Sequence, residues 1–270
     1  MKIKWNLYNR AAGLLLIAGM LCVLTVEMTS AQTNPERVRS EVFIDQADKQ
    51  NITGQTEIAF AWGELLDPPQ NLIRGVINLK EAMNRWTEIT TNINEHVLLS
   101  NPYIMNMPFI FVSTNRVFDL TETERKNLRA YFDNGGFMFL DNSQPVSDFS
   151  ASGASLQKLL KDVIPNVRFA PVPNSHEIYH SFFDFDDGPP RGAELGLIPT
   201  RDPTMYVRSK ERYFLEGAWR NDELVAVYSD KGYIVKWNDT SNNEPQLRMG
   251  VNLIVYALTK WDSIAKRSYR

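Results

Sequence analysis

The chain has 270 residues, of which 43% are hydrophobic and 23% are charged, and its formal net charge at pH 7 is -3. A chain of this length and composition can bury a full core, which excludes intrinsic disorder, a collagen-like repeat and a disulfide-stapled miniprotein. The net negative charge does not match the basic surface that recognises phosphate backbones, so we expect no nucleic-acid partner.

The first 31 residues have the pattern of an export signal. Three basic residues precede an apolar run from Ala11 to Val26, and small residues follow up to Ala31. We predict a signal peptide over residues 1–31 and an exported protein that is periplasmic or secreted. The apolar run is shorter than the roughly 20 residues that a membrane-spanning helix needs. Retention of this segment as an uncleaved anchor is the alternative, and only then do we expect contact with a membrane.

The only cysteine in the sequence, Cys22, lies in this predicted signal. We therefore expect an exported chain without disulfides, thiolate nucleophiles or thiolate metal ligands. His176 and His180 stand four residues apart, but the residues between them do not fit a zinc-protease motif, and the acidic run Asp184–Gly188 misplaces the glycine of a calcium loop. We predict no metal site and no cofactor.

After a polar segment over residues 32–56, which we expect to lie across the surface, apolar runs alternate with amphipathic stretches. The expected elements, in chain order, are a strand at 57–62, a helix at 72–86, strands at 89–93 and 108–112, a helix beginning at the Thr121/Glu124 capping box, a strand at 137–140 and a helix at 156–163. This alternation is typical of an α/β fold with a mostly parallel central sheet.

The amino-acid composition changes in the last third of the chain. Residues 174–219 are rich in Pro, Gly, Asp and Arg, and we predict a long excursion, or lid, before the last strands. Two strands at 224–229 and 233–237 are predicted to form a hairpin, and a final helix follows at 247–258. We expect one α/β domain over residues 57–260 and a basic tail over residues 261–270.

In an open parallel α/β sheet, ligands bind beyond the carboxyl ends of the strands, at the point where the strand order reverses. The candidate ligand-binding residues at these ends are Trp62, Asn115, Asp141 and Asn142. An acid, amides and an aromatic ring suit a polar, uncharged ligand such as a sugar or a peptide better than a phosphate. Asp and Asn are also ordinary turn and cap residues, so a purely structural role is the alternative.

His176 is the remaining candidate, because the excursion that carries it could fold over the same edge of the sheet. Paired with Asp141, it would supply the acid/base couple of a hydrolase. The alternative is a histidine that is simply hydrogen-bonded within a lid. The distance between these two side chains discriminates between the two interpretations.

Several stretches of the sequence resemble a known bacterial family. They are Asn71–Leu72, Pro108–Phe111, Leu128–Asp141, His176–Tyr179 and Arg248–Thr259. Through them, residues from about 57 to 260 resemble the bacterial domain of unknown function 4159 family. That family looks like a distant relative of the class I glutamine-amidotransferase and trehalose-utilisation proteins, and the resemblance implies a flavodoxin-like three-layer sandwich.

The resemblance implies a fold rather than a reaction. Amidotransferases of this fold carry a cysteine at the sharp turn after a central strand, and if the strand ending at Leu140 is the matching one, this chain has Asp141-Asn142 there. It also has Glu177 where the family tends to have proline. We therefore expect an exported, non-catalytic binding or interaction domain whose partner is a glycan, a peptide or an envelope protein. The alternatives are a hydrolase and a structural subunit of a cell-envelope complex.

Overall fold

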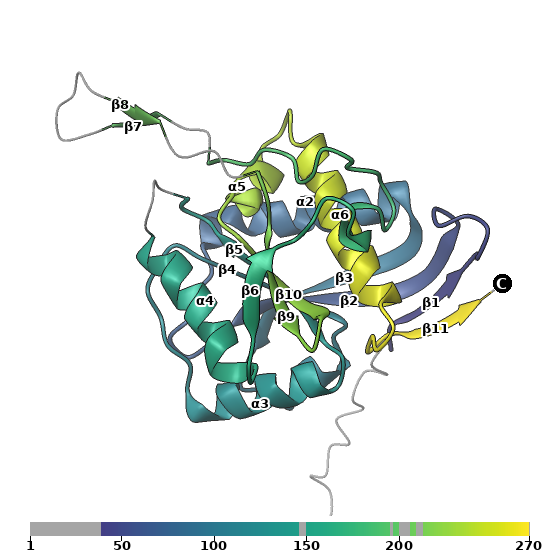
Figure 1. The fold of residues 1–270 in the computed structure, drawn as a ribbon, viewed down its shortest axis with the longest axis horizontal. Helices are drawn as coiled ribbons and strands as arrows, with labels where there is room; N and C mark the ends of the chain where they lie inside the picture. The colour runs from purple at the N-terminus through teal and green to yellow at the C-terminus, as the bar shows by residue number, and fades with distance from the viewer. Residues whose placement is uncertain (1–38, 146–149, 195–196, 200–205, 209–212, 270) are drawn as a thin grey trace, which may run out of the picture. The chain divides into compact units, whose positions relative to one another are not determined.

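The computed structural model describes residues 39–145, 150–194, 197–199, 206–208 and 213–269 (Figure 1). The predicted signal peptide, residues 1–31, lies outside the described residues. Residues Val38–Arg270 cluster into one compact unit. Among the described helices, none is both long enough and apolar enough to span a bilayer.

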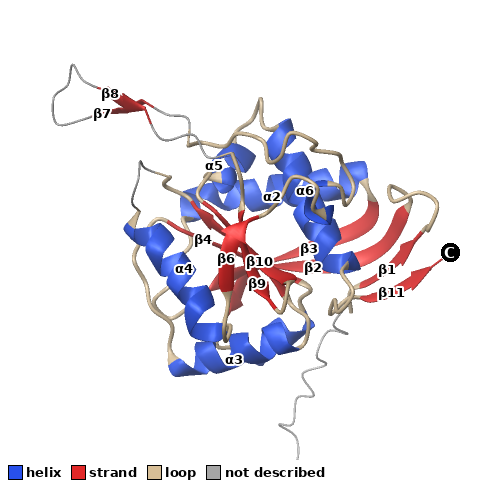
Figure 2. Cartoon of the chain, viewed as in Figure 1, coloured by secondary structure: helices blue, strands red, loops and turns tan. Residues whose placement is uncertain are grey.

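Strands and helices alternate along most of this unit (Figure 2). The strands are β1 (Glu41–Ile44), β2 (Ile52–Trp62), β3 (Glu88–Leu98), β4 (Phe109–Thr114), β5 (Phe137–Asn142), β6 (Arg168–Pro171), β7 (Leu197–Pro199), β8 (Tyr206–Arg208), β9 (Glu216–Arg220), β10 (Glu223–Ser229) and β11 (Lys266–Tyr269). The helices are α2 (Ile73–Trp86), α3 (Glu122–Asp133), α4 (Ala151–Val163), α5 (Tyr233–Asn238) and α6 (Glu244–Thr259), with short 3₁₀ turns η1 (Gln70–Leu72), η2 (Pro102–Asn106) and η3 (Glu177–Tyr179).

The main sheet has the strand order β11-β1-β2-β4-β5-β10-β9-β6, and β3 pairs with β2. The five strands β3, β2, β4, β5 and β10 run parallel to one another. The pairs β1–β2, β9–β10 and β6–β9 are antiparallel. Strands β7 and β8 form a separate two-stranded sheet. The prediction of an α/β fold with a mostly parallel central sheet is confirmed, and the antiparallel pairs near the sheet ends are an addition to it.

The parallel strands are buried because alternate side chains enter two different cores. Phe109 and Phe111 of β4 belong to one hydrophobic cluster, to which α2, α5 and α6 contribute. Ile110 and Val112 of the same strand belong to a second cluster, to which α3 and α4 contribute. A strand with apolar side chains on both faces reads as an unbroken apolar run, which is why this part of the sheet is visible in the sequence.

The prediction of a strand at 233–237 is wrong, because these residues form helix α5. Tyr233, Ile234 and Trp237 are all buried, and this spacing places them on one face of a helix. Strand β10 instead pairs with β9, through a tight turn at Asn221 and Asp222. Both turn residues have positive φ, 51° and 63°, as a two-residue type I′ hairpin requires.

The two ends of the domain also differ from the sequence-based expectation. The segment 32–56 was expected to lie across the surface, but Glu41–Ile44 forms β1 and the next strand already begins at Ile52. The tail expected at 261–270 contains β11, which pairs in parallel with β1. Both short strands mix polar and apolar residues, so their own sequences give little sign of the pairing.

Candidate functional site

The strand order reverses at β2. The chain adds β3 on one side of β2 and later returns to place β4 on the other side. The carboxyl ends of β2 and β4 are therefore neighbours, and the loops that follow them begin at Gly63 and Asn115. In an open parallel sheet this arrangement opens a crevice between the two loops.

A pocket of about 260 Å³ lies between these loops, and we call it the crevice. Its walls are residues 67–71 from the loop after β2 and residues 115–116 from the loop after β4. The Thr114 hydroxyl donates to the backbone oxygen of Asp67 at 3.2 Å, and the Arg116 guanidinium lies 3.6 Å from the Asp67 carboxylate. Of the residues singled out in the sequence, Asn115 lines this crevice.

Buried Glu124 fixes the loop after β2. Its carboxylate accepts hydrogen bonds from the backbone N–H of Glu64 at 2.9 Å and from that of Thr121 at 2.8 Å. The Thr121 side chain completes the capping box by accepting from the N–H of Glu124. A Cβ on Gly63 would lie only 2.7 Å from this carboxylate, so a larger residue there would displace the Glu124 side chain from its present position.

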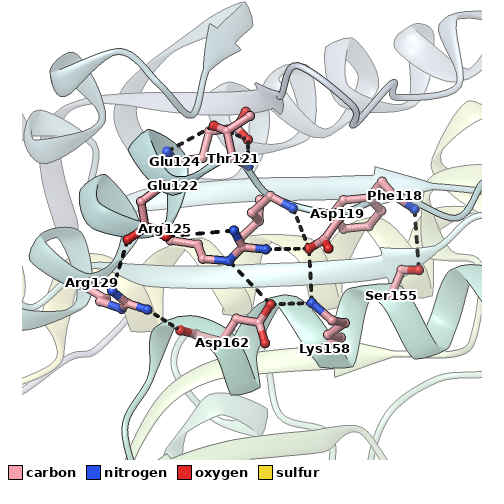
Figure 3. A network of polar contacts seen from close by, with 11 residues as sticks. Phe118, Asp119, Thr121, Glu122, Glu124, Arg125, Arg129, Ser155, Lys158 and Asp162 are labelled. Atoms are coloured by element: carbon pink, nitrogen blue, oxygen red, sulfur yellow. Dashed lines mark hydrogen bonds and ion pairs between the residues drawn. The ribbon is translucent and has the colours of Figure 1, made fainter.

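A network of charged side chains fixes the loop after β4 (Figure 3). The Asp119 carboxylate accepts hydrogen bonds from Arg125 at 2.7 Å and from Lys158 at 3.0 Å, which lowers the pKa of Asp119. Lys158 also contacts Asp162 at 2.5 Å. The network joins the end of this loop to both α3 and α4, so both walls of the crevice are held by the scaffold.

Asp141 does not line an open crevice. It is fully buried at the end of β5, where its Oδ2 accepts a hydrogen bond from the backbone N–H of Ile234 at 2.9 Å. Burial raises the pKa of Asp141 to about 7, and the hydrogen bonds from Ile234, Ser229 and Tyr233 oppose that rise. Its Oδ1 has no hydrogen-bond partner among the described residues. The side chain positions α5, and burial lets it keep its proton to a higher pH than an ordinary aspartate does.

Asn142 is also buried, and both the nitrogen and the oxygen of its side-chain amide form hydrogen bonds. Its Nδ2 donates to Ser150 Oγ at 3.0 Å and to Asp230 Oδ1 at 2.7 Å, and its Oδ1 accepts from Ser152 Oγ at 2.9 Å. These contacts tie the end of β5 to the start of α4 and to the end of β10. Asn142 has the structural role that its residue type also predicted.

Trp62 lies farther along the same edge of the sheet, where β2 and β3 end. Its ring stacks on that of His96, with centroids 4.3 Å apart and planes at 11°. The indole N–H donates to the backbone oxygen of Glu95 at 3.0 Å. The Trp62 ring is half-buried, and the stacked His96 ring already covers part of its surface.

The structure does not bring His176 to Asp141. The His176 ring packs against Tyr256, at 5.5 Å between centroids, and Tyr256 packs against Phe137 at 5.2 Å. Phe137 begins β5 and Asp141 lies four residues along it, about 13 Å at the usual rise of a strand. His176 Nδ1 accepts from the N–H of Ile178, and burial lowers the pKa of His176. It is a histidine hydrogen-bonded within the excursion.

A buried ion pair that the sequence did not suggest lies near the end of β10. Lys231 Nζ is 2.8 Å from Glu194 Oε1, and the two side chains are only 1% and 2% exposed. Glu194 also accepts from the N–H of Gly192, and the N–H of Ala193 donates to the oxygen of Lys231. The pair fixes the middle of the excursion to the segment that follows β10. In the sequence, Asp230-Lys231-Gly232 looked only like a turn.

No curated protein matches this sequence significantly. A family model described as a domain of unknown function (DUF4159) matches residues 67–258, which is most of the chain and includes both walls of the crevice. The chain therefore belongs to the DUF4159 family.

Proposed function

We propose that this protein is an exported, non-catalytic binding domain that recognises a polar group in the crevice formed by residues 67–71 and 115–116. One observation carries the proposal: a polar-walled pocket of about 260 Å³ lies where two adjacent parallel strands end and the strand order reverses. Open α/β sheets bind their ligands at this position.

The chemistry of the walls supports a polar ligand. The exposed amides of Gln70, Asn71 and Asn115 supply both donors and acceptors. The ion pair between Arg116 and Asp67 is largely exposed, at 74% and 62%, so a ligand can rearrange it at little cost in free energy. These groups match a peptide backbone or a sugar hydroxyl, as the sequence suggested.

The order β3-β2-β4-β5-β10 of the parallel strands supports a flavodoxin-like fold of the amidotransferase type. In that fold the residue after the central strand carries the chemistry, and Asp141 stands there in this chain. If β5 is the matching strand, the burial of Asp141 and its hydrogen bond to α5 support a role in the scaffold for that position. The separation of His176 from Asp141 likewise gives the hydrolase alternative no support.

Binding can be tested on the immobilised full chain with two defined probe sets, a glycan array and a phage-displayed library of random dodecapeptides. We expect at least one class of probe to bind, and Asn115→Ala to weaken that binding by about tenfold, the effect of losing one well-placed contact. Lys126→Ala, which removes an exposed side chain on α3, is the matched control and should leave binding unchanged. Binding that is indifferent to both variants, or no binding at all, would reject the crevice as the site.

A further inference from the structure

Three exposed aliphatic side chains lie on the same edge of the sheet as the crevice. Leu65 is 62% exposed, Leu98 is 41% exposed and Val117 is 67% exposed. They follow or end β2, β3 and β4, which are adjacent strands. We call them the apolar rim.

Described contacts connect the three positions. Leu98 is the register partner of Trp62, and the next N–H, that of Leu99, donates to the oxygen of Trp62 at 2.8 Å. Leu65 lies in the turn that follows Trp62, and it precedes Asp67 by two residues. Val117 directly follows Arg116, which contacts Asp67. Leu65 and Val117 therefore lie within two residues of the crevice walls, and Leu98 lies at the end of the strand beside β2.

The charge beside the rim is negative. Glu64 and Glu95 are exposed, and neither forms an ion pair with another described residue. Asp67, by contrast, has Arg116 as its partner. The surface around the crevice therefore combines aliphatic side chains with two carboxylates that a cationic partner can neutralise.

We propose that the crevice and the apolar rim together bind an extended segment of a partner protein that carries both aliphatic and basic side chains. This inference rests on the proposed function and names its ligand class. The crevice amides suit the peptide backbone, the rim suits the apolar side chains, and Glu64 and Glu95 suit lysine or arginine. A glycan fits less well, because the burial of leucine and valine favours apolar partners and the Trp62 ring is already stacked on His96.

The test uses the random dodecapeptide library on the immobilised full chain, with enriched peptides identified by sequencing. We expect enrichment of peptides that combine aliphatic residues with Lys or Arg. The double variant Glu64→Lys/Glu95→Lys should reverse the charge preference and select Asp or Glu instead. Leu65→Ser and Val117→Ser should each weaken the binding of the selected peptides by about tenfold. Trp261→Ser, which alters an exposed side chain outside the rim, is the matched control and should change nothing.

Each other outcome overturns the inference. Peptides enriched without a charge bias, or with a bias that Glu64→Lys/Glu95→Lys does not reverse, would show that the acidic rim does not select the partner. If a glycan binds in a manner sensitive to Asn115→Ala and no peptide is enriched, the proposed binding function stands and the peptide assignment fails. If neither probe binds, both fail.

Discussion

The carboxylate of Asp141 accepts a hydrogen bond from the backbone N–H of Ile234, 93 residues later in the chain, inside a fully buried environment. This contact joins the end of β5 to the first turn of α5. It gives the acid at the end of this central strand a structural role, because the side chain holds the start of a helix in place.

The pH dependence of folding should report this buried acid. The pKa of Asp141 is about 7 in the folded protein, against about 3.9 in an unfolded chain. Between these values the folded state keeps a proton that the unfolded state releases. The Asp141 contribution to stability is therefore full below pH 4, falls as the pH rises toward 7 and is constant above it.

We therefore expect Asp141→Asn to flatten the fall in the free energy of unfolding between pH 4 and 7. At pH 8 the variant should be more stable than the natural protein by on the order of 2 kcal/mol, because the amide oxygen can still accept from Ile234 without a buried charge. Urea unfolding across this pH range measures the effect. Asp187→Asn, at an exposed position, is the control. Destabilisation by Asp141→Asn at pH 8 would contradict the raised pKa of this buried acid.

We expect Glu124 to be the main residue that holds the loop after β2 in place. Glu124→Ala leaves the N–H groups of Glu64 and Thr121 without their acceptor, and we expect it to cost about 2–3 kcal/mol of stability in chemical denaturation. Glu122→Ala in the same helical turn is the control, because its side chain is 79% exposed, and it should change stability by less than about 0.5 kcal/mol. Equal effects of the two substitutions would show that Glu124 does not hold the loop.

The buried pair of Lys231 and Glu194 should be far more sensitive to the loss of one partner than to the replacement of both. Lys231→Met alone leaves a buried carboxylate without its partner, and we expect a loss of about 3–5 kcal/mol. Adding Glu194→Gln removes that charge, and the double variant should recover most of the loss. A double-mutant cycle by denaturant unfolding measures this coupling; additive effects would rule it out.

The N-terminus of the mature protein can be determined directly. If residues 1–31 are a cleaved signal peptide, the mature protein should begin near Gln32, and N-terminal sequencing of the protein from an expressing bacterium should find it there. A protein that retains Met1 in the membrane fraction would instead identify the apolar run from Ala11 to Val26 as an anchor.

Local patterns in the sequence were sufficient to predict much of the scaffold. The apolar runs around Phe109 and Phe137 predicted strands buried on both faces, and the spacing of Thr121 and Glu124 predicted the start of α3, because such periods and caps depend on residues close together in the chain. The same patterns carried the family resemblance, and the absence of cysteine after Ala31 was decided by composition alone.

Only the tertiary structure decided which residues at the strand ends line a crevice and which are buried. The sequence placed Asn115 and Asp141 in one group of candidates, yet the first lines a crevice and the second is buried under α5. It also could not show that Tyr233 begins a helix, since a short apolar run fits either a strand or a helix until its packing is known. The contacts that separate these cases join residues dozens of positions apart, and no local pattern encodes their distance. Packing therefore determined which polar residues line the crevice and which hold the fold together.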